Sequence, residues 1–415
     1  MRRILTIIML LLAISTAIHA QRNEIYKPEI ATLQVVAGER WLSMPIVRLN
    51  GDEVINISFD DLTHEYHRYT YTLEHCDADW SKSEELFASD YMAGFAEGNT
   101  IDDVTESLNT NVLYTHYSLS IPNRTCRIKM SGNYRLTVYD ENDDNEKILT
   151  ACFMVVEPVM GVMLDVSANT DIDIRHSHQQ VSMDIGFGNL TVTDPISQVK
   201  TVVMQNMRWD NAVINSRPDY LIPNGMRWQH HKDYIFPAGN EYHKFEILDA
   251  NHPTMGIDQI TWDGENYHAW PFASEPRNNY IYDEDANGAF YIRNSENIEN
   301  ERQSEYVYVH YTLMCPSPVQ GDVYINGVWT NDMFTPEYQM NYNHEKRCYE
   351  AVVLQKQGYY SYQYLMMDKD GTLKTMPTEG NFHQTENKYQ ALVYFRAAGD
   401  RSDRLVGYQE VQYRQ

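Results

Sequence analysis

The sequence is poor in positive charge and lacks the short motifs on which common enzyme chemistries depend. Its 415 residues carry 58 Asp and Glu against 33 Lys and Arg, a formal net charge of −25 at pH 7. A surface without a basic stripe gains nothing from releasing phosphate counterions, which disfavours nucleic acid and anionic lipid as partners. The sequence has no G-x-S-x-G element, P-loop, H-E-x-x-H element or EF-hand loop. We therefore expect no enzyme, no cofactor and no metal.

Cysteine is also scarce, and its spacing excludes several kinds of site. The five cysteines form no C-x-x-C pair, so zinc ribbons and thioredoxin-like redox chemistry have no support. Two disulfide pairings are candidates, Cys126 with Cys152 and Cys315 with Cys348, and at least one thiol then stays free unless it pairs with another chain. The alternative is that most of the five, Cys76 included, are small buried apolar residues.

A long apolar run occurs only at the N-terminus. Met1-Arg2-Arg3 precedes the run Ile4 to Ile14, and Ala17-Ile18-His19-Ala20 offers small residues for signal peptidase. We predict that residues 1–20 are a signal peptide that is removed. The alternative, an N-terminal membrane anchor, is disfavoured because the run falls short of the ~20 residues that span a bilayer. No later stretch is long enough to cross as a helix, so we expect an exported chain in an oxidising compartment.

Helical periodicity is nearly absent, whereas alternation of period two is abundant. Alternating runs rich in Tyr, Val and Thr, each typical of a half-buried strand, include Tyr69–Leu73, Tyr134–Val138, Val181–Ile185, Tyr306–Tyr311, Tyr359–Met366 and Tyr389–Phe395. Pairs such as Asn224-Gly225 and Asn326-Gly327 supply the positive-φ residues of tight hairpins. The pattern predicts an all-β chain of β-sandwich domains.

Breaks in the strand rhythm predict the domain boundaries. We expect an N-terminal β-sandwich over residues 21–157, closed by the breaker Pro158, and a more irregular β-rich domain over residues 158–300. The polar stretch Asn294 to Glu301 has almost nothing to bury and reads as a linker. A third sandwich with a short tail would then occupy residues 301–415.

Few clusters of reactive side chains stand out. His75 and Cys76 lie beside Asp77, but adjacent residues on a strand point to opposite faces, which weighs against a catalytic pair. A structural alternative is that Asp60, Asp61 and His75 hold a long loop by hydrogen bonds to the backbone.

Two pairs of histidines are candidates for metal ligands. His176-Ser177-His178 would place two imidazoles on one face of a strand, but no third ligand follows at a motif-like distance. The pair His230-His231 is weaker still. Neither pair predicts a metal site.

The first predicted domain resembles one protein family closely. The residues that carry the resemblance occur in the family's order: Phe59-Asp60-Asp61-Leu62, His75-Cys76-Asp77-Ala78-Asp79-Trp80, Tyr91-Met92-Ala93-Gly94-Phe95, Asn109-Thr110, Tyr114-Thr115-His116-Tyr117, Ile121-Pro122-Asn123 and Ser131-Gly132-Asn133-Tyr134. They are similar to the plug protein of the type 9 secretion system of the Bacteroidota, and the likeness extends over almost the whole mature chain.

The resemblance implies a non-enzymatic periplasmic protein of immunoglobulin-like domains at the inner face of the outer membrane. Such plugs bind the periplasmic end of a very large outer-membrane β-barrel translocon and prevent leakage through it. The resemblance implies no catalytic residue, cofactor or direct membrane span.

Binding usually resides in loops that a rigid sandwich displays, and aromatic residues are enriched at interfaces. We therefore expect the segment Asp77 to Asn111 to contribute to contact with the barrel. The candidate partner-binding residues are Asp77, Asp79, Trp80, Tyr91, Phe95, Asn109 and Tyr114.

The third predicted domain has a looser resemblance to early-set domains that include glycogen-binding modules. Its carrying residues are Val323 to Trp329, Met340-Asn341-Tyr342 and Gln357 to Tyr364. Sugar-binding members have a further Trp, where this chain reads Thr330 to Phe334. The alternative function is a periplasmic or surface glycan-binding protein in which Trp329 or its neighbours stack on sugar. An enzyme acting on polysaccharide through Asp60 or Asp61 is a more distant alternative.

Overall fold

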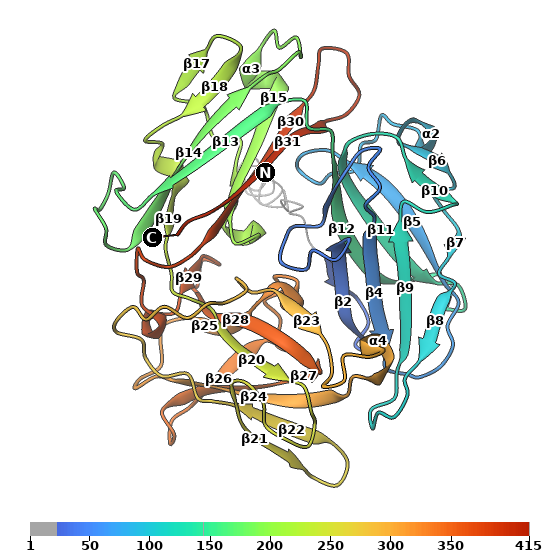
Figure 1. The fold of residues 1–415 in the computed structure, drawn as a ribbon, viewed down its shortest axis with the longest axis vertical. Helices are drawn as coiled ribbons and strands as arrows, with labels where there is room; N and C mark the ends of the chain where they lie inside the picture. Colours follow the sequence, from blue (N-terminus) through green and yellow to red (C-terminus); the bar gives the residue numbers. More distant parts are fainter. Residues whose placement is uncertain (1–22, 144, 415) are drawn as a thin grey trace, which may run out of the picture.

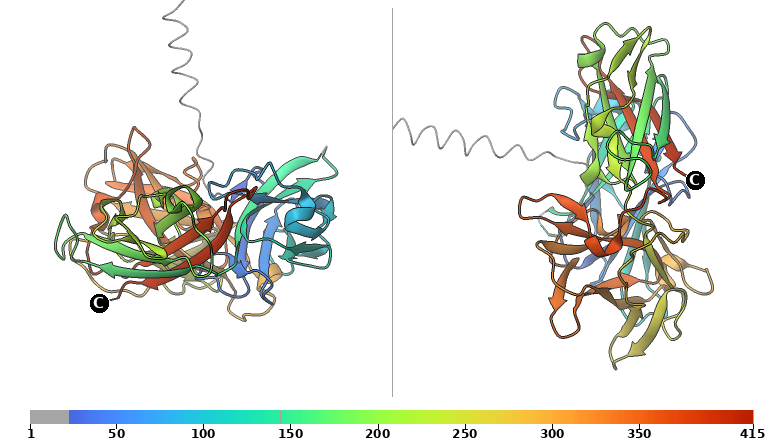
Figure 2. Two further views of the ribbon diagram at one scale, coloured as in Figure 1. Left: turned by 90° about the horizontal axis from the view of Figure 1, so that it is seen from above. Right: turned by 90° about the vertical axis from the view of Figure 1, so that its left-hand side faces the viewer.

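The computed structural model describes residues 23–143 and 145–414, and these form three β-sheet modules arranged as a triangle (Figure 1). The prediction of an all-β chain of sandwich domains is confirmed. The predicted signal peptide, residues 1–20, lies outside the described residues. Figure 2 shows the molecule from two further sides, with the modules lying beside one another rather than stacked along the shortest axis.

The first module (residues 23–157) is a sandwich of two sheets around one apolar core. One sheet has the order β1 (Glu24–Ile25), β12 (Glu146–Val156), β11 (Gly132–Asp140), β5 (Tyr69–Cys76), β7 (Asn99–Thr100), with β3 (Ile46–Arg48) parallel to β12. The other is β2 (Ile30–Ala37), β4 (Ile55–Asp61), β9 (Thr115–Ile121), β8 (Asp103–Glu106). A short ribbon of β6 (Met92–Gly94) and β10 (Cys126–Ile128) follows α2 (Ala88–Tyr91).

The second module has two facing sheets around a separate core. The first is β13 (Gly161–Ser167), β14 (His178–Gly186), β18 (Gly225–Trp228), β17 (Tyr220–Ile222), with β19 (Ile235–Pro237) on β14. The second is β16 (Val213–Ile214), β15 (Val199–Gln205), β30 (Lys388–Phe395), β31 (Arg404–Gln412). Short helical turns are α3 (Pro195–Gln198), η1 (Trp209–Asn211) and η2 (Lys232–Tyr234).

The third module is a ten-stranded sheet that bends around its own core. Its order is β20 (His243–Ile247), β28 (Gly358–Met367), β25 (Asp322–Asn326), β26 (Gln339–Asn343), β27 (Cys348–Lys356), β24 (Tyr306–Met314), β22 (Tyr267–Pro271), β21 (Ile257–Trp262), with β23 (Phe290–Ile292) and β29 (Leu373–Thr375) on β28. The helical turns are α4 (Asn300–Gln303), η3 (Val328–Thr330) and η4 (Pro377–Glu379).

Strand pairing divides the chain differently from the boundary predicted at residue 300. Strands on both sides of it, β20 to β23 and β24 to β29, belong to one sheet. The last two strands, predicted in the third domain, return to the second module, where β30 pairs with β15 along Val199 to Gln205. The polar stretch 294–301 therefore marks a loop inside the third module. Proline and polar runs report where a strand ends, but they do not report which sheet it joins.

Strand β12 explains how the first and second modules are joined. Leu149, Ala151 and Phe153 point into the first module's core, whereas Cys152 and Met154 belong to a second apolar cluster shared with β15, β30 and β31. Successive side chains on a strand point to opposite faces, so a strand buried on both faces reads as a continuous apolar run. This is why Ile148 to Val156 does not alternate.

The structure shows neither of the candidate disulfides. Cys126 Sγ lies 2.9 Å from Met92 Sδ, and Cys315 Sγ lies 3.0 Å from the carbonyl oxygen of Ser317. All five cysteines are buried, in agreement with the alternative that they act as small apolar residues. In the part of the chain that the structure describes, no helix is both long and apolar enough to cross a membrane.

Candidate functional site

The His75-Cys76 pair has the chemistry of a buried structural element. His75 Nδ1 lies 2.9 Å from Ser83 Oγ, and its ring packs against Tyr134, whereas Cys76 faces the apolar cluster on the other side of β5. Burial lowers the pKa of His75 and raises the pKa of Cys76 to about 12. A nucleophilic cysteine needs a lowered pKa, so this pair is not arranged for nucleophilic catalysis.

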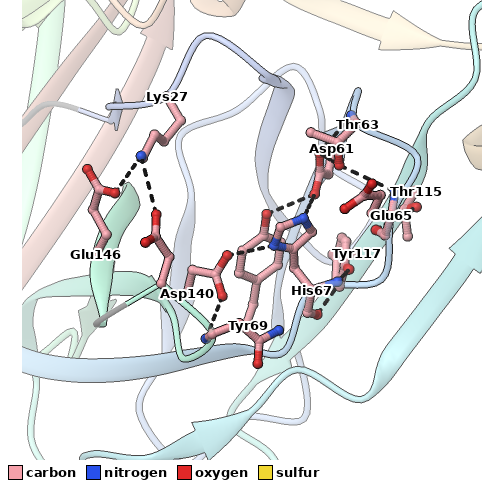
Figure 3. A network of polar contacts seen from close by, with 12 residues as sticks. Lys27, Asp61, Thr63, Glu65, His67, Tyr69, Thr115, Tyr117, Asp140 and Glu146 are labelled. Atoms are coloured by element: carbon pink, nitrogen blue, oxygen red, sulfur yellow. Dashed lines mark hydrogen bonds and ion pairs between the residues drawn. The ribbon is translucent and has the colours of Figure 1, made fainter.

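Asp61 organises the loop that follows β4, as Figure 3 shows. Its carboxylate accepts hydrogen bonds from the backbone N–H of Thr63 at 2.9 Å and from the hydroxyl of Tyr69 at 2.9 Å. His67 Nδ1 lies 2.6 Å from Asp140 Oδ2, and its Nε2 lies 3.8 Å from Asp61 Oδ2. The two carboxylates therefore hold residues 62–68 against β5 and β11.

The same network bears on the polysaccharide-enzyme alternative. Asp60 and Asp61 are adjacent on β4, and Asp60 bonds to Tyr306 and Lys356 of the third module while Asp61 bonds within the first. A glycosidase needs two carboxyl groups facing one substrate bond. Asp60 and Asp61 do not share a face.

The two pairs of histidines considered as metal ligands are not arranged as a metal site among the described residues. His176 precedes β14 and is exposed, while His178 Nδ1 lies 2.7 Å from Asp173 Oδ2, so the two imidazoles do not share a strand face as predicted. In the second pair, His231 Nδ1 lies 3.1 Å from Asp219 Oδ1. Among residues 23–143 and 145–414, no group of three or more His, Cys, Asp or Glu is placed to hold a metal ion.

Trp329 is packed inside the third module rather than displayed. Its ring contacts those of Tyr311, Tyr338 and Tyr360, and its Nε1 donates to the carbonyl oxygen of Ser361 at 3.2 Å. With 9% of its surface exposed, the ring has no free face on the protein surface for a sugar. Trp329 is thus not displayed at the surface for sugar stacking, and the glycan-binding alternative would have to rely on its neighbours.

Tyr114 joins the first module to the third instead of facing a partner. It is fully buried, and its hydroxyl donates to the carbonyl oxygen of Ser304 at 2.8 Å. The loop before it is held in the same way, because the Glu305 carboxylate accepts from the backbone N–H of Val112 at 3.0 Å and from that of Asn111. The predicted partner residue is part of an internal joint.

The centre of this joint is a buried charge cluster around Asp60. Its carboxylate lies 2.6 Å from Lys356 Nζ, 2.6 Å from His116 Nδ1 and 2.7 Å from Tyr306 Oη. Burial on its own raises the pKa of Asp60, but the charge of Lys356 and the hydrogen bond and charge of His116 outweigh it, so the pKa is lowered. Asp60 therefore stays ionised inside the protein.

Asp77 and Trp80 join the first module to the second. Asp77 Oδ2 lies 2.5 Å from an Arg396 guanidinium nitrogen, and its Oδ1 accepts from the backbone N–H of Asp403 at 3.0 Å. Trp80 is 1% exposed and packs edge-on against Trp209, with ring centroids 5.6 Å apart. Both were predicted to bind a partner, and both are used within the chain.

Of the other four residues predicted to bind a partner, one is buried and three are exposed. Tyr91 is buried, and its hydroxyl donates to the Leu73 carbonyl oxygen at 3.1 Å. Asp79, Phe95 and Asn109 are exposed. Aromatic residues with large desolvated area suit an internal joint as well as a binding surface, which is why the sequence pattern does not separate the two groups.

One exposed aromatic residue carries no signal in the sequence. Phe87 precedes α2 and is 74% exposed, and Phe95 follows β6 and is 68% exposed. Both belong to residues 86–97, near the corner of the first module that carries α2 and β6 (Figure 1). No pattern marks Phe87, because Leu86-Phe87-Ala88 reads equally well as a buried segment.

Comparisons with known proteins identify relatives of the first module and of the whole chain. Residues 30–157 match the family model for the first domain of the type 9 secretion system plug protein, and they run from the first residue of β2 to the residue after β12. A solved crystal structure of a hypothetical protein from Parabacteroides merdae ATCC 43184 is 39% identical, with a TM-score of 0.91, over 94% of this chain and 99% of that one.

The search of curated proteins returned no match. The matching first module contains the seven motifs quoted above, and the structure gives them roles in its core and its joints. Through this first module, residues 30–157, the chain belongs to the type 9 secretion system plug protein family.

Proposed function

We propose that the chain is a non-enzymatic periplasmic plug, which binds and occludes the periplasmic end of the large outer-membrane barrel translocon of the type 9 secretion system. In this role it sits at the inner face of the outer membrane and prevents leakage of small solutes. The observation that carries the proposal is the match of the first module to the family's first domain.

The joints between the modules support this role. A protein that occludes a channel opening has to keep its domains in a fixed arrangement. Domains of one chain are expected to move relative to each other unless the interface between them is large and apolar. Here the first and second modules share a buried apolar cluster, and the first and third share the Asp60–Lys356 ion pair. We expect these contacts to restrict movement of the modules relative to one another.

The exposed aromatic residues of the first module are the proposed contact with the barrel. Phe87 and Phe95 offer large apolar area on a rigid sandwich, and binding energy at interfaces concentrates in such anchors. The buried Tyr91, the last residue of α2, packs beneath this corner. The exposed Asp79 and Asn109 remain candidates for polar contacts with the barrel, but Asn109 lies in the loop that contacts the third module, where Leu108 donates to the Arg302 carbonyl oxygen.

Affinity purification from intact membranes tests the proposal. A tag after Gln415 extends beyond the exposed Arg414, and in Figure 1 the C-terminus lies far from α2. After extraction in mild detergent we expect mass spectrometry to recover one very large outer-membrane barrel at stoichiometric level. Recovery of free monomer under conditions that preserve the translocon would refute the proposal.

The surface is tested with variants that leave the joints intact. Phe87→Ser with Phe95→Ser should lose the barrel and increase the leakage of small solutes across the outer membrane. The matched control is Ile172→Ser with Ile174→Ser, because these residues are exposed to a similar degree, at 61% and 75%, but lie on the second module. Equal loss of the barrel in both double variants would show that the first module does not provide the specific contact.

A further inference from the structure

A cavity of about 370 Å³ lies where β1 and β2 of the first module meet the third module. Its wall on the third module is aromatic and includes Trp329, Tyr338 and Tyr360, and the opposite wall includes Ile30 and Leu33 of β2. Binding sites for small molecules are commonly apolar cavities of about 300–1,000 Å³ between domains, with a few polar groups that fix orientation. The volume of this cavity and its largely apolar walls match the first part of that description.

Gln355 supplies a polar group on the wall of this cavity. It is 4% exposed, and its Oε1 accepts a hydrogen bond from Tyr311 at 2.6 Å, whereas its Nε2 has no hydrogen-bond partner. Among the cavity-lining side chains that the structure describes, this is the one buried nitrogen or oxygen left unpaired. A buried amide donor without an acceptor costs free energy, so an acceptor placed in the cavity would be favoured.

The wall on the first module carries backbone strain. Thr32 lies in a bulge where the pairing of β2 with β4 shifts between Ala31 and Gln34, and its φ is +52°. A β-branched residue in the left-handed region is a rare and costly conformation, and such strain gathers at ligand-binding sites. The Thr32 hydroxyl lies 2.6 Å from the Tyr306 hydroxyl, so the bulge is held by the third module.

The charges at the cavity favour a neutral ligand. Lys27 is the one cationic side chain among the described residues that line the cavity, and it is engaged by Glu146, whose Oε2 lies 2.5 Å from Lys27 Nζ, so it is not free to neutralise an anionic ligand. Burial raises the pKa of Glu337, which makes this carboxyl group a weaker partner for a cationic ligand. The net charge of −25 also repels anions.

We propose that this cavity binds a small neutral molecule with a mostly apolar body and one carbonyl oxygen, which accepts a hydrogen bond from Gln355 Nε2. The aromatic wall of Trp329, Tyr338 and Tyr360 packs against the apolar body. A sugar is a poorer fit, because its many hydroxyl groups need more partners than these walls offer. The site is separate from the exposed surface at Phe87 and Phe95 and does not depend on the proposed plug function.

Fluorescence titration with 6-propionyl-2-(dimethylamino)naphthalene tests the proposal on the mature full chain. This probe is neutral and aromatic, carries one carbonyl group, and shifts its emission to the blue in apolar surroundings. We expect saturable binding of one molecule per chain with a blue shift. Removing the donor in Gln355→Met should weaken binding about five- to tenfold, as expected for one neutral hydrogen bond.

Blocking variants locate the site. Ala31→Trp fills the cavity from the first module and should abolish binding, whereas Ala93→Trp on β6, which does not line the cavity, should bind like the parent chain. If Ala31→Trp fails to fold, Met333→Trp blocks the cavity from the third module and serves the same purpose.

Three outcomes would overturn the proposal. They are the absence of saturable binding to the parent chain, equal binding to the parent chain and to a folded blocking variant, and displacement of the probe by maltoheptaose but not by decanamide. The last result would assign the cavity to carbohydrate.

Discussion

Lys356 Nζ lies 2.6 Å from Asp60 Oδ2 and 4.1 Å from the centre of the Tyr114 ring, so one buried ammonium group ties the third module to β4 and to the residue just before β9 of the first. Both charged side chains are 1% exposed. Desolvating two charges is costly, and the cost is offset only when further hydrogen bonds complete the geometry. Tyr306 and His116 supply those bonds to Asp60.

Removing the ammonium should destabilise the protein strongly. In Lys356→Met the Asp60 carboxylate keeps its burial and loses its principal counter-charge, which costs about 3–5 kcal/mol in comparable buried pairs. Urea unfolding measures the loss. The matched control is Lys346→Met, because Lys346 is 66% exposed in its pair with Glu350, and its removal should leave the urea midpoint nearly unchanged. Similar losses in the two variants would contradict the assigned role of the pair.

The free energy of unfolding should decrease at acidic pH because Asp60 becomes protonated. Its pKa is lowered in the folded protein, so its contribution is complete above the unfolded pKa of about 3.9 and is lost as the pH falls through the lower folded value. Urea midpoints at pH 7, 5 and 3 should therefore fall below about pH 4. Asp60→Asn should show a smaller fall over the same range, and parallel pH profiles for the two proteins would contradict this reasoning.

Gly132, part of one family motif, should not tolerate a side chain. Its φ is +148°, and a Cβ atom built on it would lie 2.2 Å from His75 Nε2. Since His75 is held by Ser83 and by the Ser131 carbonyl oxygen, it has little room to move. Gly132→Ala should cost about 2 kcal/mol or more in urea unfolding.

A second glycine separates backbone strain from this steric clash. Gly98 also has a positive φ, +71°, but no atom lies within 4 Å of the place that a Cβ atom would occupy. Gly98→Ala should therefore cost about 1 kcal/mol, from the left-handed backbone conformation alone. If Gly98→Ala were as damaging as Gly132→Ala, contact with His75 would not be the cause.

The buried thiols should be unreactive in the folded protein. Burial raises the pKa of Cys76 and of Cys126 to about 12, and the thiolate is the reactive form. With iodoacetamide at pH 8 and no reductant, peptide mapping should find both residues unmodified in the native protein and alkylated in urea. A requirement for reductant before alkylation in urea would reveal a disulfide.

The sequence by itself determined the strand content, the acidic surface and the family resemblance of the first module. Each of these depends on local information: alternation along a run such as Tyr69 to Leu73, a count of charges, or short motifs in a given order. Pro158 likewise predicts the end of a strand, and β12 ends at Val156. A breaker at that point interrupts the chain whatever its partners are.

Only the tertiary structure decided which strands share a sheet and which conspicuous residues face solvent. The return of β30 and β31 to the second module depends on pairing with β15, almost two hundred residues away, which no local pattern records. Trp80 and Tyr114 looked like partner-binding residues because large aromatic side chains gain by leaving water in any interface. The chain uses both in its own joints, and it leaves Phe87 and Phe95 exposed instead. The same physical force acts on all four, and only their positions in the fold separate them.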